Sequence, residues 1–167
     1  MPMKPSTLTR DTFLARFGPV YEASPWVVEA VWPAAAGGAL DTREAMAEAM
    51  RDAVDGAPRD AKLALIRAHP QLAVAGRMAE ASVREQRGAG LDQCAPDELA
   101  AFRRLNAAYL DRFGFPFIIA VAGLSRGEIL AAFAARLENE PEAEFATAIA
   151  QIHRIAGFRL VSLFDPG

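Results

Sequence analysis

The chain has 167 residues, of which 52% are hydrophobic and 23% are charged, and its formal net charge is −3 at pH 7. This length fits one domain with a sizeable buried core, and the composition is typical of a soluble globular protein. Basic residues are scattered, which argues against nucleic acid as a partner, since nucleic-acid-binding proteins usually present a basic face. We therefore expect a single domain over residues 1–167.

Targeting and cysteine features favour a cytoplasmic protein. The N-terminus lacks the apolar core of a signal peptide, and the longest apolar run, residues 115–124, is shorter than the roughly 20 residues that a membrane span needs. Cys94 is the single cysteine, which excludes an internal disulfide and a cysteine-rich zinc site. No HExxH motif or phosphate-binding loop occurs, so we expect no metal and no nucleotide cofactor.

Helix signals begin near the N-terminus. Thr9 is a typical cap for a first helix, which Gly18 should end. Ser24 and Pro25 then mark the start of a second helix. We expect Pro33 to end that helix, because proline removes a backbone donor.

The next helix is predicted from a capping box. Asp41 and Glu44 have the spacing of that motif, and an Ala- and Met-rich helix follows to about Val54. A further amphipathic helix then stops at the pair His69-Pro70.

Three more helix starts are expected in the second half of the chain. Pro96 begins one helix, with acidic residues in its first turn. Ser125 and Glu128 form a capping box for the next. Pro141 begins the last helix, which runs to about Phe164.

The apolar run of residues 115–124 fits either a buried helix or a strand. We favour a buried, partly irregular helical segment, because no other stretch offers a convincing strand partner. With about six to nine helices, short connections and almost no β-alternation, the chain is expected to be an all-α, single-domain helical bundle.

His69 is the first candidate for chemistry. Pro70 pushes it away from helical geometry, so the imidazole lies where a helix breaks. Histidine is the side chain whose unperturbed pKa, about 6.5, suits proton transfer near neutrality. A histidine stabilised by the helix dipole explains the same position, and the residues alone leave both interpretations open.

A second candidate is the polar triplet of Ser82, Glu85 and Gln86. The spacing of i, i+3 and i+4 places all three on one helix face. A carboxylate beside an amide and a hydroxyl suits a ureido or imidazolone group, because glutamate accepts N–H bonds and glutamine both donates and accepts. The alternative is a solvated helix face on which Ser82 and Glu85 form a capping box.

Arg159 shares the apolar sector of the last helix. An arginine directed at the core must be paired or must face a polar cavity, so a structural salt bridge and a clamp for an anionic ligand both stay open. We expect His153, at the edge of this sector, to be structural. Asn106 lies on the apolar face of its own helix, where we expect it to fill a buried polar gap.

Several stretches together resemble the OHCU decarboxylases, which act on 2-oxo-4-hydroxy-4-carboxy-5-ureidoimidazoline in urate breakdown. The similarity covers almost the whole chain, through FGPVYEASPWVVEAVW, AHPQLA, SVREQRGAGL, LNAAYLDRFGFPFIIAV and a closing RIAGFRL. Each piece alone is weak, but the histidine-proline pair, S-x-x-E-Q-x-x-A-G-L and F-G-F-P-F-I are highly specific in combination.

The resemblance implies an all-α homodimer that makes (S)-allantoin without a metal or organic cofactor. It also implies that His69 is the catalytic acid/base, while Glu85 shares the proton transfer or holds the ureido group. The substrate-binding residues that it implies are Pro70, Ser82, Val83, Arg84, Glu85, Gln86, Phe117, Ile118, Ile119, Ala120, Val121 and Arg159.

Two other functions stay open for such a chain. One is a non-catalytic helical binding or scaffold protein on the same fold, and the other is a different small-molecule lyase or hydrolase. The acid/base pair of His69 and Glu85 favours an enzyme, because a scaffold has no need of such a pair beside an arginine.

Overall fold

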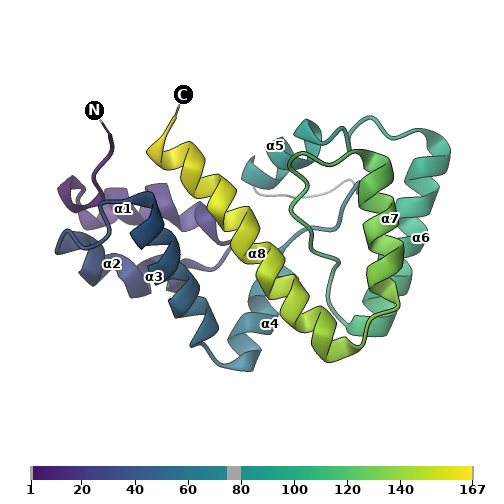
Figure 1. Cartoon of the computed structure of the whole chain (residues 1–167), viewed down its shortest axis with the longest axis horizontal. Helices are drawn as coiled ribbons and strands as arrows, with labels where there is room; N and C mark the ends of the chain where they lie inside the picture. The colour runs from purple at the N-terminus through teal and green to yellow at the C-terminus, as the bar shows by residue number, and fades with distance from the viewer. Residues whose placement is uncertain (1, 75–79, 167) are drawn as a thin grey trace. The chain divides into compact units, whose positions relative to one another are not determined.

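The computed structural model describes residues 2–74 and 80–166, and the regular secondary structure of that part is helical (Figure 1). It contains eight α-helices, two short 3-10 helices and no strand, which confirms the predicted all-α class. None of these helices is long and apolar enough to cross a membrane. The elements are η1 (Pro5–Thr7), α1 (Arg10–Phe17), η2 (Gly18–Val20), α2 (Pro25–Ala36), α3 (Arg43–Asp55), α4 (Arg59–Ala68), α5 (Glu80–Gly88), α6 (Pro96–Phe113), α7 (Arg126–Leu137) and α8 (Pro141–Phe164).

The chain divides into two compact units. The first consists of Met1–Ala68 and His153–Gly167, and therefore contains α1 to α4 with the C-terminal part of α8. The second consists of His69–Ile152, and therefore contains α5, α6, α7 and the N-terminal part of α8.

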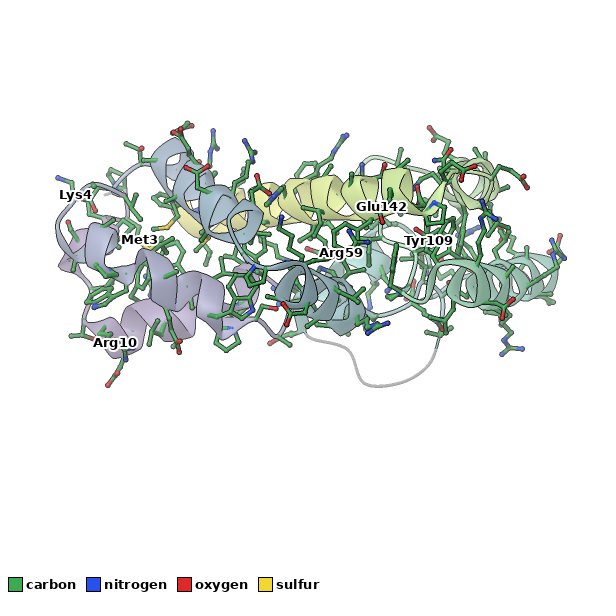
Figure 2. All side chains as sticks on the ribbon, turned by 90° about the horizontal axis from the view of Figure 1, so that it is seen from below. Met3, Lys4, Arg10, Arg59, Tyr109 and Glu142 are labelled. Atoms are coloured by element: carbon green, nitrogen blue, oxygen red, sulfur yellow. The ribbon has the colours of Figure 1, made fainter. Side chains whose placement is uncertain are left out.

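The first unit is packed around aromatic and methionine side chains. Helix α2 contacts both α1 and α3 (Figure 1). Phe17 stacks on Phe13 with ring centroids 4.9 Å apart and meets Phe164 of α8 edge to face at 5.8 Å. Met50 of α3 is fully buried, whereas Arg10 points outward from the unit (Figure 2). Apolar residues inside and charged residues outside follow the amphipathic pattern of these helices.

The core of the second unit is an aromatic cluster. Phe117 stacks on Phe133 of α7, with ring centroids 3.9 Å apart. Tyr109 of α6 meets the two rings edge to face at 5.4 and 5.8 Å, and Figure 2 shows it directed inward. All three rings are buried. These contacts pack the segment that carries Phe117 against α6 and α7.

Most predicted helix ends are confirmed. Thr9 caps α1 through its side chain, and Ser125 and Glu128 form the predicted capping box of α7. Helix α4 ends at Ala68, directly before His69. The two caps are local signals, because each capping side chain lies three residues from the backbone N–H that it satisfies.

Two predicted boundaries are wrong. Helix α2 continues through Pro33 and ends at Ala36, with Gly37 as its C-cap, because the missing N–H affects only the carbonyl of Glu29, an exposed residue that water can reach. The N-cap of α3 is Thr42 and not Asp41. The Asp41 carboxylate instead accepts hydrogen bonds from the backbone N–H and the hydroxyl of Ser6, at 2.8 and 2.6 Å.

The prediction of a partly helical segment at residues 115–124 is also wrong. The segment is buried over most of residues 115–121, as expected, but it forms neither helix nor strand. Pro116 has no N–H to donate and pushes Phe115 towards extended backbone. The N–H of Ala120 donates instead to Oε1 of Gln151 on α8, at 2.9 Å. Side chains therefore replace the regular hydrogen bonding of a helix here.

We predict that Phe133→Ala lowers the free energy of unfolding by about 3–5 kcal/mol, because it removes a fully buried ring that stacks on Phe117. Urea denaturation followed by far-UV circular dichroism measures this loss. Leu110→Ala is the matched control on an exposed position, with an expected change within about 0.5 kcal/mol. Equal small losses in both variants would contradict this description of the core.

Candidate functional site

His69 lies directly after α4 and is buried, with 7% of its surface exposed. Neither it nor Pro70 belongs to a helix, so the predicted break at this pair is confirmed. The break places a titratable imidazole on irregular backbone, where its direction is set by neighbouring contacts and not by a helical repeat.

Helix α5 directs part of the predicted polar triplet inward. Ser82 and Gln86 are buried, Glu85 is half-buried, and Arg84 is exposed and pairs with Glu80 at 3.4 Å. Ser82 also lies inside the helix and not at its N-cap. The alternative of a solvated face with a capping box is therefore wrong for Ser82. The half-buried Val83 completes this part of the predicted site.

Gln86 ties α5 to the backbone that follows His69. Its Oε1 accepts a hydrogen bond from the N–H of Ala73, and its Nε2 donates to the carbonyl of Gln71, both at 3.1 Å. Ala73 has a φ of 56°, a left-handed conformation that costs a non-glycine residue on the order of 1–3 kcal/mol. The two bonds from Gln86 help to hold this conformation.

Asn106 of α6 binds the same stretch of backbone. Its Nδ2 donates to the carbonyl of Leu72 at 2.9 Å, and both residues are buried. The prediction that Asn106 fills a buried polar gap is confirmed. We refer to Gln86 and Asn106 as the amide clamp, because they bond to three consecutive residues of the chain, 71–73.

A pocket of about 680 Å³ adjoins the amide clamp in the second unit. Val83 and Gln86 are the predicted substrate-binding residues among those that line it. Most of its wall is apolar, and Arg87 and Asp92 form an ion pair there at 3.8 Å. The lining residues are Ala73, Val74, Val83, Gln86, Arg87, Leu91, Asp92, Leu99 and Arg103.

The predicted apolar contact segment, residues 117–121, is buried except for the half-buried Ile119. The expected backbone contacts to a ligand are constrained, because the N–H of Ala120 is bonded to Gln151. All predicted site residues except Arg159 belong to the second unit.

Arg159 forms a buried salt bridge inside the first unit. Its Nη1 donates to Oε2 of Glu22 and to the carbonyl of Pro19, each at 2.9 Å. The two charged side chains are only 7% and 3% exposed. The salt bridge that the sequence left open is therefore present.

Glu22 is a functional candidate that the sequence interpretation missed. The available signal was Arg159 itself, because an inward arginine requires a counter-charge, and Glu22 is a lone carboxylate in an apolar stretch. The next residue, Ala23, has a φ of 44°, and the hydroxyl of Ser24 donates to the Glu22 carbonyl at 2.8 Å. This local turn fixes the backbone of Glu22.

His153 joins two other residues of the first unit. Burial raises the pKa of Tyr21, so its phenol stays protonated, and the Tyr21 hydroxyl is hydrogen-bonded to Nδ1 of His153 at 2.8 Å. Nε2 of His153 is hydrogen-bonded to Oδ1 of Asp55, also at 2.8 Å. These bonds agree with the structural role predicted for His153.

Cys94 and metal ligation add little to the candidate site. Burial raises the pKa of the Cys94 thiol, which disfavours the reactive thiolate. No group of three or more His, Cys, Asp or Glu residues within 2–74 and 80–166 is arranged to hold a metal ion.

In comparisons with known proteins, residues 6–161 of the chain match the model of the OHCU decarboxylase family. A 2-oxo-4-hydroxy-4-carboxy-5-ureidoimidazoline decarboxylase of Haloferax volcanii is 39% identical over 158 residues, which cover 95% of this chain and 92% of the relative. The uric acid degradation bifunctional protein PucL of Bacillus subtilis is 41% identical, over 92% of this chain and 30% of its own length. A crystal structure of (S)-allantoin synthase superposes with a TM-score of 0.79 and 34% identity, over 96% of this chain and 53% of the solved chain.

We predict that Glu22→Ala lowers the free energy of unfolding by about 3–5 kcal/mol, because it removes the carboxylate opposite a buried guanidinium. Urea denaturation measures the change. Glu29→Ala, at an exposed position of α2, is the control. A loss below about 1 kcal/mol, as at a surface ion pair, would show that the Glu22–Arg159 bridge contributes little.

Proposed function

This chain belongs to the OHCU decarboxylase family, and we propose that it converts 2-oxo-4-hydroxy-4-carboxy-5-ureidoimidazoline to (S)-allantoin and CO₂ in urate degradation. The structural observation that supports this proposal is a link between two motifs of the family resemblance, the His-Pro pair and S-x-x-E-Q. The buried histidine of the His-Pro pair lies on irregular backbone, and Gln86 of the S-x-x-E-Q motif bonds to that backbone two and four residues later.

The reaction itself sets the demands on the site. The bond between the carboxylate and the hydroxyl-bearing ring carbon breaks, and its electron pair forms a double bond to the ureido-bearing carbon. The C=N electrons move onto the ring nitrogen, which takes up a proton. The hydroxyl then loses its proton as the carbonyl forms, and the ureido-bearing carbon is protonated on one face to give the (S) product.

His69 is the proposed acid/base for these proton transfers. One imidazole accepts the hydroxyl proton and returns a proton to carbon, which requires a group that titrates near neutral pH. Its burial supports this role, because a proton delivered by a fixed side chain reaches one face, whereas bulk water reaches both.

The inward face of α5 is the proposed binding site for the ureido group. Glu85 accepts ureido N–H groups or shares the proton transfer, and Ser82 and Gln86 supply a hydroxyl and an amide. Pro70 and Val83 contribute apolar contact. Arg84 contributes through its backbone, because its side chain is exposed and pairs with Glu80.

The remaining contacts are assigned to residues 117–121 and to Arg159. The buried segment is the proposed apolar contact that excludes water from the intermediate. Arg159 is the proposed electrostatic anchor of the anionic substrate, an assignment that the family resemblance supports. A guanidinium has five N–H donors, so a bond to Glu22 is compatible with a second anionic partner.

We also propose that the protein acts without a cofactor, as a homodimer in the cytoplasm and as a single domain over residues 1–167. The family resemblance supports the homodimer and the cofactor-free reaction. A single cysteine suits a reducing compartment.

The direct test mixes freshly generated substrate with the protein and follows optical activity. We predict that the wild-type protein yields (S)-allantoin and that His69→Asn, judged folded by circular dichroism, loses turnover by about 10²-fold or more. His153→Asn is the control for loss of a histidine and should keep turnover. If the wild-type protein adds nothing to the spontaneous racemic reaction, the proposed function fails; if His69→Asn makes the same product at the wild-type rate, the role of His69 fails.

For Arg159→Ala we predict a KM raised about tenfold or more, equivalent to about 1.4 kcal/mol of lost substrate binding, with a smaller effect on kcat. Initial rates over a range of substrate concentrations measure both constants. A lower melting temperature with an unchanged KM would instead restrict Arg159 to the salt bridge with Glu22.

A further inference from the structure

We propose that Arg136 is a positioning residue for the reaction, and that together with Gln151 it fixes the backbone of residues 118–120. This inference rests on the proposed function, because it takes this segment to contact the substrate. Neither residue belongs to the substrate-binding set that the family resemblance implies.

Arg136 of α7 makes three contacts with one guanidinium. Its Nη1 donates to the carbonyl of Ile118, and its Nε donates to Oε1 of Glu144 at 2.7 Å. Its Cζ also lies 4.4 Å from the centroid of the Phe117 ring. The guanidinium therefore contacts both the backbone and an adjacent side chain of the apolar segment.

Glu144 holds the guanidinium in place and is itself completely buried. Its Oε1 accepts a hydrogen bond from the Tyr109 hydroxyl at 2.7 Å, and its Oε2 accepts one from Nδ2 of Asn139 at 3.2 Å. Burial, and next the bond to Glu144, raise the pKa of Tyr109, so the phenol remains a donor. The buried carboxylate thus accepts three hydrogen bonds, which replace the water that burial excludes.

Gln151 of α8 holds the same segment two residues further on. Its Oε1 accepts from the N–H of Ala120 at 2.9 Å, whereas Arg136 donates to the carbonyl of Ile118. One backbone acceptor and one backbone donor are therefore bonded to side chains from two different helices. Because the segment has no helix or strand ladder, these bonds define its path.

Stability alone does not account for this network. Replacing a buried ion pair by apolar side chains is often neutral or stabilising. Nη2 of Arg136 is also buried and has no hydrogen-bond partner among the described residues, a cost that an apolar side chain avoids. What arginine adds is a planar fork that presents its donors to the carboxylate and the carbonyl in fixed directions, whereas the ammonium of lysine is a point charge on a flexible stem.

Loss of these bonds is expected to displace the segment relative to the bound substrate. A displacement of about 1 Å in a substrate contact can cost on the order of 10²-fold in rate. A segment that shifts also admits water to the intermediate, so the face of protonation is no longer controlled.

Arg136→Lys separates charge from geometry, because it keeps a cation opposite Glu144 but loses the fork. We expect kcat/KM to fall about tenfold or more, equivalent to about 1.4 kcal/mol, together with the enantiomeric excess of (S)-allantoin. Hydrogen exchange of the peptide covering residues 115–121 should become faster. A purely structural role would lower the melting temperature without changing the enantiomeric excess.

The matched control is Arg112→Lys. Arg112 also donates to a backbone carbonyl, that of Asn139 at 2.9 Å, and lies 5.1 Å from the Phe113 ring centroid, but it is exposed. The same substitution there should leave kcat/KM, enantiomeric excess and exchange at residues 115–121 unchanged.

Wild-type kcat/KM and enantiomeric excess in Arg136→Lys would overturn the inference, whatever the melting temperature. If that variant does not fold, Gln151→Met provides the test, since it removes the acceptor of the Ala120 N–H; an unchanged enantiomeric excess there would equally overturn the inference. If the wild-type protein makes no (S)-allantoin, the proposed function fails, while the exchange comparison still shows whether Arg136 fixes the segment.

Discussion

Buried backbone needs hydrogen-bond partners, and in the second unit this requirement falls on two segments without regular structure. One follows α4 and begins with His69, and the other is the apolar segment at residues 115–121. Neither has a helical repeat or a neighbouring strand to satisfy its N–H and carbonyl groups. Helices supply the missing partners through long polar side chains, which are Gln86, Asn106, Arg136 and Gln151.

This arrangement connects the fold to the proposed chemistry. Irregular backbone directs side chains in ways that a helix does not allow, but without support it is mobile. The amide clamp supports the stretch after His69, including the left-handed Ala73. Arg136 and Gln151 support the apolar segment. Two segments held in this way can present an acid/base and an apolar surface to a small substrate with little loss of entropy on binding.

The same constraint explains which structural features could be predicted from the sequence alone. Helix α7 was predicted with its capping box, because Ser125 and Glu128 satisfy backbone groups within one turn. The path of residues 115–124 was not predicted, because the side chains that hold it are distant in sequence. Arg136 lies 18 residues from its partner Ile118, and Gln151 lies 31 residues from its partner Ala120. The inward position of Arg159 was predicted from periodicity, but its partner Glu22 lies 137 residues away. A single sequence therefore predicts local helix caps, but it does not predict which side chains pair with residues far away in the chain.

In the proposed enzyme, the segment after His69 and the apolar segment line one substrate site. Backbone amide chemical shifts, followed by NMR during titration with (S)-allantoin, test this arrangement, with (R)-allantoin as the matched control. We expect the largest (S)-specific shifts at residues 69–74 and 117–121 and on the inward face of α5. Shifts confined to other parts of the chain, or equal for the two enantiomers, would contradict it.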